Sequence, residues 1–145
     1  MTGMDPAISG GIVPIYPALT QIHAKFVDII HTDAGWIGES SSVGHIDFWV
    51  NDNGTPQYKC SLLNIFDLCN STSQQSTKIL RRISNKIINK STIIGKKCSG
   101  STFTKAACTG TVTASMGFYA DQYASNPGNY YVATKTNGIP PYSVQ

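Results

Sequence analysis

The densest hydrophobic pattern of the chain lies in its first third. Residues 26–30 form an apolar run interrupted by a single aspartate, which is typical of a strand covered on both faces of a sheet. A second run, residues 45–50, is rich in aromatic and β-branched residues and follows a loop of Gly and Ser, which predicts another strand. We therefore expect the chain to be organised around two buried strands.

The segments on either side carry weaker signals. Pro14 and Pro17 interrupt residues 12–22, which predicts irregular chain leading into the first strand. Near the other end, two short aromatic runs, residues 116–121 and 129–135, are separated by Asn-Pro-Gly. This pattern predicts two further strands joined by a turn.

Residues 72–90 have the period of an amphipathic helix. Apolar residues recur at helical spacing while Lys and Arg take the other positions; the apolar set is Ile79, Leu80, Ile83 and Ile87. A basic face of this kind is usually solvated, and contact with an anionic lipid surface is the alternative. No aromatic interleaving or nucleic-acid motif is present, so we predict no nucleic-acid partner.

A short loop between Cys60 and Cys69 is unusually apolar. Five of its eight residues are hydrophobic: Leu62, Leu63, Ile65, Phe66 and Leu68. A loop closed by a disulfide cannot bury five such side chains by itself, so it needs a core, a lipid surface or a substrate to pack against. Core packing and lipid contact both remain open.

Length and charge restrict the class of protein. The chain has 145 residues, enough for one domain with a real core and too few for two comfortable ones. It carries 11 Lys and Arg against 8 Asp and Glu, with the bases concentrated between Lys78 and Lys105. No apolar run is long enough to cross a membrane, and no signal peptide follows Met1.

The cysteines favour a secreted protein. The four cysteines lack the close Cys-x-x-Cys spacing of a metal site, and an even count is typical of disulfides. Three pairings are possible, and we predict the neighbouring pairs Cys60–Cys69 and Cys98–Cys108. Three N-glycosylation sequons begin at Asn53, Asn70 and Asn89. Together these features predict an extracellular protein whose signal lies outside this chain.

The candidate chemistry is limited by the number of histidines. The chain has no Gly-x-Ser-x-Gly elbow, and its histidines are His23, His31 and His45. A serine hydrolase of the α/β type needs that elbow followed by an acid and then a histidine, so the chain alone lacks a nucleophile and a base.

Each of the two central runs also carries a His-x-Asp pair. His31 and Asp33, and likewise His45 and Asp47, share a strand face because side chains alternate. Four such side chains could hold a metal if their strands were neighbours, although His and Asp at strand ends more often make structural hydrogen bonds. An acid–base pair drawn from Asp28, Asp33 and Asp47 is a further reading, which no spacing singles out.

Several blocks resemble one known family. MTGMDPA is similar to the Gly-Leu-Asp-Pro-Ala turn of the pancreatic-lipase-like family of secreted lipases and phospholipases. AKFVDIIHTDAGWIG, SSVGHIDFWVNDNGTPQYKC, MGFYAD and GNYYVATKTNGIPPY resemble later blocks of that family, in the same order. The resemblance implies that residues 1–145 are the C-terminal half of one α/β-hydrolase domain. The implied fold is a mixed, mostly parallel sheet with an amphipathic helix and two disulfides.

The resemblance also implies roles for individual residues. Asp5 matches the triad acid, which would orient the catalytic histidine. That histidine normally follows the second lid cysteine in a Cys-x-His pattern, but Ser71 stands at this position here. Cys60 to Cys69 would bracket a short lid. Ala18, Thr20 and His23 lie near the places where some members bind calcium, so we predict no metal and no cofactor.

Two functions from different classes follow from this resemblance. The first is part of a secreted lipase or phospholipase that cleaves carboxylic esters of lipids. Under this hypothesis the 145-residue chain is incomplete and is inactive by itself. The second is a catalytically dead relative, similar to the fly yolk proteins, that binds lipid or a partner. A third reading is a truncated gene product without a function of its own, because half of a sheet exposes an unpaired edge.

Overall fold

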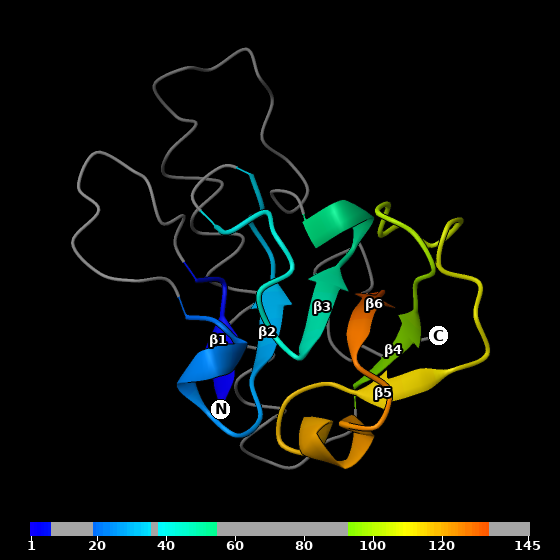
Figure 1. Ribbon diagram of the computed structural model, residues 1–145. Helices are drawn as coiled ribbons and strands as arrows, with labels where there is room; N and C mark the ends of the chain where they lie inside the picture. The colour runs from blue at the N-terminus through cyan, green and yellow to red at the C-terminus, as the bar shows by residue number, and fades with distance from the viewer. Residues whose placement is uncertain (7–18, 36–37, 55–92, 134–145) are drawn as a thin grey trace, which may run out of the picture.

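A computed structural model describes residues 1–6, 19–35, 38–54 and 93–133. In these four ranges six strands form one sheet: β1 (Thr2–Met4), β2 (Asp28–His31), β3 (Ile46–Val50), β4 (Ile94–Lys97), β5 (Thr113–Ser115) and β6 (Gly128–Val132). Their order across the sheet is β1-β2-β3-β6-β4-β5 (Figure 1). Three short 3₁₀ turns connect them: η1 (Gln21–His23), η2 (Asp52–Gly54) and η3 (Ala120–Tyr123). Within these residues no helix has the length and apolar character needed to span a membrane.

The sheet is mixed, with a parallel part and an antiparallel edge. β1, β2, β3 and β6 run parallel to one another, whereas β4 pairs antiparallel with both β6 and β5. Parallel strands end at the same edge of a sheet, and loops beyond that edge commonly carry binding or catalytic residues. The residues that follow β1, β2 and β3 are therefore brought together at one edge.

The two central strands were correctly expected to be buried. All residues of β2 and β3 are buried, including the polar Asp28, His31 and Asp47. One core cluster joins the aliphatic side chains of these strands to β6 and to the segment around Met116; it contains Ile30, Ile46, Phe48, Val50, Ile93, Ala114, Met116, Ala120, Tyr130 and Val132. Burial on both faces explains why the strand sequences are almost continuously apolar.

The expected strand over residues 116–121 is wrong. β5 ends at Ser115, and the chain then turns at Gly117, whose φ is +80°. The backbone N–H of Ala120 donates to the carbonyl of Gly117 at 2.8 Å, which closes a turn directly before η3. Glycine adopts positive φ without steric cost, so the aromatic run enters a turn. The second expected strand of this pair is confirmed as β6. Asn126 and Pro127 precede this strand, and Gly128 is its first residue.

Other expected elements are tested only in part. A disulfide joins Cys98 to Cys108, as the neighbouring pairing predicted. The amphipathic helix over residues 72–90, the lid-like loop with Cys60 and Cys69, and the sequons at Asn70 and Asn89 lie outside the described residues. These expectations stay predictions.

Asp28 is a buried carboxyl whose ionisation opposes folding. Its Oδ1 accepts a hydrogen bond from the Thr2 hydroxyl at 2.8 Å, while Oδ2 is buried and has no hydrogen-bond partner among the residues that the structure describes. Burial is the largest cause that raises the pKa of Asp28 from 3.8 to about 6. The protonated carboxyl is therefore favoured in the folded state, and stability is lost as pH rises from about 4 through about 6.

We expect Asp28→Asn to increase the free energy of unfolding at pH 7 by up to about 3 kcal/mol, with little gain at pH 4. The asparagine removes the ionising group and keeps an acceptor for Thr2. Urea denaturation at both pH values would measure the difference. Asp121→Asn, at an exposed carboxyl, is the control and should change neither value. An equal effect of Asp28→Asn at the two pH values would contradict the prediction.

Candidate active site

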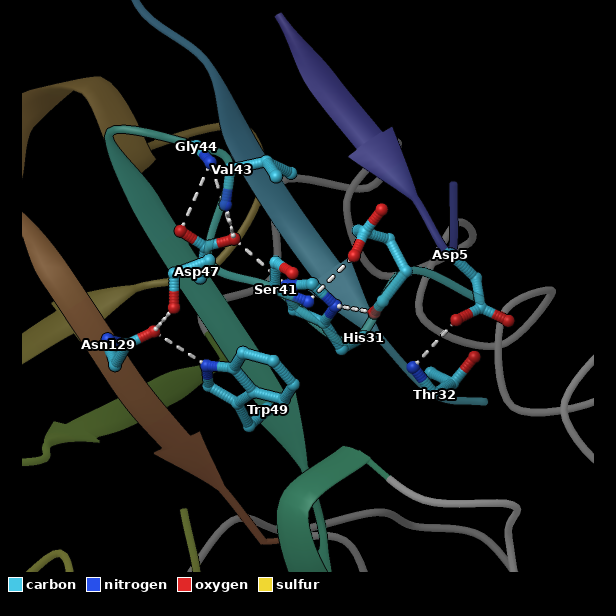
Figure 2. A network of polar contacts seen from close by, with 11 residues as sticks. Asp5, His31, Thr32, Ser41, Val43, Gly44, Asp47, Trp49 and Asn129 are labelled. Atoms are coloured by element: carbon cyan, nitrogen blue, oxygen red, sulfur yellow. Dashed lines mark hydrogen bonds and ion pairs between the residues drawn. The ribbon is translucent and has the colours of Figure 1, made fainter. Parts of the chain in front are cut away.

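Asp5 lies directly after β1, at the edge where the parallel strands end (Figure 2). Its φ is +50°, a left-handed conformation that turns the chain sharply out of the strand. One carboxylate oxygen, Oδ1, accepts hydrogen bonds from the backbone N–H groups of Thr32 and Asp33, each at 3.0 Å. The Asp5 N–H donates in turn to the Ile30 carbonyl at 2.7 Å. Asp5 is therefore held by the end of the neighbouring strand, and its other oxygen, Oδ2, has no hydrogen bond within the described residues.

A glycine allows the chain to pass close to this carboxylate. A Cβ at Gly38 would lie 2.7 Å from Asp5 Oδ1 and 3.1 Å from the Asp33 carbonyl. The next residue, Glu39, donates its backbone N–H to the Pro6 carbonyl at 2.7 Å. Residues 38 and 39 therefore pack directly against Asp5 and Pro6, and a side chain at position 38 would push the carboxylate away.

Asp33 is a second carboxyl beside Asp5. It is buried, and its Oδ1 has no hydrogen-bond partner within the described part of the chain. Burial, and after it the negative charge of Asp5, raises the pKa of Asp33 from 3.8 to about 6. Two ionised carboxylates close together in a poorly hydrated site repel each other. Ionisation of only one of Asp5 and Asp33, or a positively charged group nearby, is therefore favoured.

His31 and Asp47 form a buried pair between β2 and β3. His31 Nε2 lies 2.9 Å from Asp47 Oδ1, and His31 Nδ1 lies 2.9 Å from the Glu39 carbonyl. Asp47 also accepts hydrogen bonds from the backbone N–H groups of Val43 and Gly44. Both nitrogens of His31 are thus occupied, and the pair fastens the loop between β2 and β3 to the sheet (Figure 2).

An aromatic stack covers the His31 ring. The Trp49 ring lies parallel to it with a centroid separation of 3.8 Å, and Phe103 packs on Trp49 at 4.3 Å. The indole N–H of Trp49 donates to Asn129 Oδ1 at 2.8 Å. Phe103 belongs to the loop closed by the Cys98–Cys108 disulfide, and its backbone N–H donates to Asn53 Oδ1 at 2.6 Å. Asn53, the first residue of a sequon, thus has a structural role.

The remaining histidines lie away from Asp5. His45 Nδ1 accepts the backbone N–H of Val27 at 3.1 Å, before β2 begins. His23 Nδ1 accepts the N–H of Thr20 at 3.0 Å in the capping box of η1. The His-x-Asp residues therefore do not converge: His31 meets Asp47 only. No group of three or more His, Cys, Asp or Glu arranged to hold a metal occurs among the described residues.

The arrangement provides a fixed carboxylate at the loop edge of a parallel sheet, with one oxygen that has no hydrogen bond to any described residue. Such a group can orient an imidazole and stabilise its charged form, which is the role of the acid in a Ser-His-Asp triad. Ser71 and the lid residues Leu62, Leu63, Ile65, Phe66 and Leu68 lie outside the described residues. Sequence reasoning missed Glu39 and Gly38, whose contacts with His31 and Asp5 depend on the loop path.

Comparisons with known proteins agree on one family. The sequence profile of the family described as Lipase matches residues 1–139. The chain is 31% identical to a phospholipase A1 of Vespula squamosa over 118 aligned residues, which cover 81% of the chain and 37% of that protein. It is 32% identical to the pancreatic triacylglycerol lipase of Mus musculus over 154 aligned positions, covering 90% of the chain and 32% of that protein.

A further relative matches a shorter segment. Lipase member H-B of Xenopus laevis is 43% identical over 63 residues, which cover 41% of the chain and 13% of that protein. The chain thus spans between 13% and 37% of the length of these three curated relatives.

Proposed function

Because this chain belongs to the lipase family, we propose that it supplies the acidic member of a Ser-His-Asp triad that cleaves carboxylic esters of lipids. The observation that carries the proposal is the geometry of Asp5. Its Oδ1 is held by two backbone N–H groups at the end of β2, whereas Oδ2 has no hydrogen bond within the described residues. Oδ2 is then the atom that accepts the imidazole N–H of the catalytic histidine.

The substrate class follows from the relatives. One matched relative is named a triacylglycerol lipase and another a phospholipase A1, so the proposed substrate is an acyl ester of a glycerol lipid. The apolar loop between Cys60 and Cys69 would act as a short lid that touches the lipid surface. The proposed location is extracellular, in keeping with the Cys98–Cys108 disulfide.

We further propose that this chain does not cleave esters unaided. The sequence has no Gly-x-Ser-x-Gly elbow, and Ser71 occupies the position that the family resemblance assigns to the histidine. A dead relative that only binds lipid is the second candidate, and no contact among the described residues favours it.

The first test uses the purified 145-residue chain and a short-chain nitrophenyl ester. We expect no hydrolysis above that of denatured protein, because the nucleophile and the base are both missing. Hydrolysis that disappears in Asp5→Asn would contradict the proposal that the chain is inactive alone. Asp121→Asn, at an exposed position on η3, is the matched control.

The second test asks whether Asp5 can serve in a triad. Residues 1–139 would replace the matching segment of the Vespula phospholipase A1, once with Ser71 and once with Ser71→His. We expect phosphatidylcholine hydrolysis only in the Ser71→His chimera, and its loss when Asp5→Asn is added. If the folded Ser71→His chimera hydrolyses lipid equally well with Asp5→Asn, Asp5 is not the triad acid.

A further inference from the structure

Glu39 links His31 to the chain at Asp5 through its two main-chain groups. Its carbonyl lies 2.9 Å from His31 Nδ1, and its N–H donates to the Pro6 carbonyl at 2.7 Å. Pro6 follows Asp5 directly, and Gly38 touches the Asp5 carboxylate. Figure 2 shows His31 between Asp47 on one side and Asp5 on the other. A continuous set of contacts therefore runs from the buried pair to the candidate acid.

The hydrogen-bond partners of His31 fix the orientation of its ring. The Glu39 carbonyl can only accept, so Nδ1 must carry a hydrogen. Nε2 faces Asp47 Oδ1, and the Asp47 carboxyl group also accepts the backbone N–H groups of Val43 and Gly44. The ring is therefore held at both nitrogens. Both side chains of the pair are almost completely buried.

We propose that His31 is a positioning residue for Asp5. The ring, fixed by Asp47 and by stacking on Trp49, holds the Glu39 carbonyl and thereby presses residues 38 and 39 against Asp5 and Pro6. This keeps Asp5 Oδ1 on the N–H groups of Thr32 and Asp33, while Oδ2 has no hydrogen bond within the described residues. The role of His31 in catalysis rests on the proposed function. The coupling between the positions of His31 and Asp5 rests on the described contacts alone.

The N–H groups of Thr32 and Asp33 report the position of Asp5, because both donate to its Oδ1. In His31→Leu, the Glu39 carbonyl loses its donor and residues 38 and 39 lose their support. We expect amide hydrogen exchange at Thr32 and Asp33 to accelerate about tenfold more than exchange in β6, since one hydrogen bond to a charged group is weakened. Nuclear magnetic resonance of the 145-residue chain would measure both rates and the carboxyl ¹³C shift of Asp5.

A control separates positioning from general destabilisation. Val132→Ala removes two methyl groups from the core at the end of β6, away from His31 and Glu39. It is expected to accelerate exchange in β6 at least as much as at Thr32 and Asp33, and to leave the Asp5 carboxyl shift unchanged. If His31→Leu gives the same profile as Val132→Ala, His31 is only a core residue and the proposal is overturned.

A second variant covers the case in which His31→Leu does not fold. Gly38→Ala acts at the other end of the contacts, because its Cβ would lie 2.7 Å from Asp5 Oδ1. Coupling between two sites is reciprocal, so the His31 ring ¹⁵N signals should shift together with the Asp5 carboxyl signal. A shift of Asp5 with unchanged His31 ring signals would overturn the proposal. None of these readouts requires ester cleavage, so a failed chimera leaves them intact.

Discussion

Replacing Asp47 with alanine is expected to lower the free energy of unfolding by about 3 to 5 kcal/mol, because it leaves the buried Nε2 of His31 and two backbone N–H groups without their partner. Asp47 lies 2.9 Å from His31 Nε2, and both side chains are almost completely buried. The same substitution removes the acceptor for the N–H groups of Val43 and Gly44. Urea denaturation followed by circular dichroism would measure the loss.

The matched comparison removes both polar side chains. A His31→Leu/Asp47→Leu double variant places apolar side chains of moderate size in the same space, and buried polar pairs replaced in this way often retain their stability. We expect the double variant to be less destabilised than the sum of the two single Leu variants. Additive losses would show that the two side chains do not interact, and the contact between His31 Nε2 and Asp47 Oδ1 would then contribute nothing to stability.

Gly54→Ala is expected to lower the free energy of unfolding by about 2 to 5 kcal/mol, through a steric clash and an unfavourable backbone conformation. A Cβ at this position would lie 2.8 Å from both the carbonyl oxygen and the Cβ of His31. The φ of Gly54 is +61°, which side-chain-bearing residues adopt only with strain. Chemical denaturation of the purified variant would give the value.

Gly35→Ala is the control for the clash. Gly35 also has positive φ, at +80°, but a Cβ there would meet no atom of the described part of the chain within 4 Å. This variant therefore carries the backbone cost alone, about 1 to 2 kcal/mol. If the two variants lose the same stability, η2 does not pack against His31 as described.

The sequence predicted the central strands well because a strand buried on both faces has an almost continuous run of apolar residues. The run at 45–50 contains β3 and the run at 26–30 overlaps β2, since strands in the middle of a parallel sheet need apolar residues at consecutive positions. The run at 116–121 misled the interpretation for the same reason. Met116 and Ala120 of this run belong to the core from either side of a turn at Gly117, whereas Phe118 is exposed. Composition does not distinguish such a turn from a short strand.

The candidate site was predictable only in part. The position of Asp5 followed from a family resemblance, and the structure adds how its carboxylate is held. The pairing of His31 with Asp47 depends on register, because Asp47 lies opposite Ile29 while Trp49 lies opposite His31. Alternation along one strand shows which residues share a face, but it does not show how far two strands are offset. The loop path that brings Glu39 to His31 leaves no periodic signal at all.

Phe103 joins a covalently closed loop to the centre of the sheet. It stacks on Trp49, and Asn53 fixes its backbone in both directions, by the N–H of Phe103 to Asn53 Oδ1 and by the N–H of Asn53 to the Phe103 carbonyl. A loop held by these contacts cannot unfold locally while β3 stays folded. The segment between Cys98 and Cys108 should therefore open in the same cooperative step as the strands beneath it, as part of one folding unit.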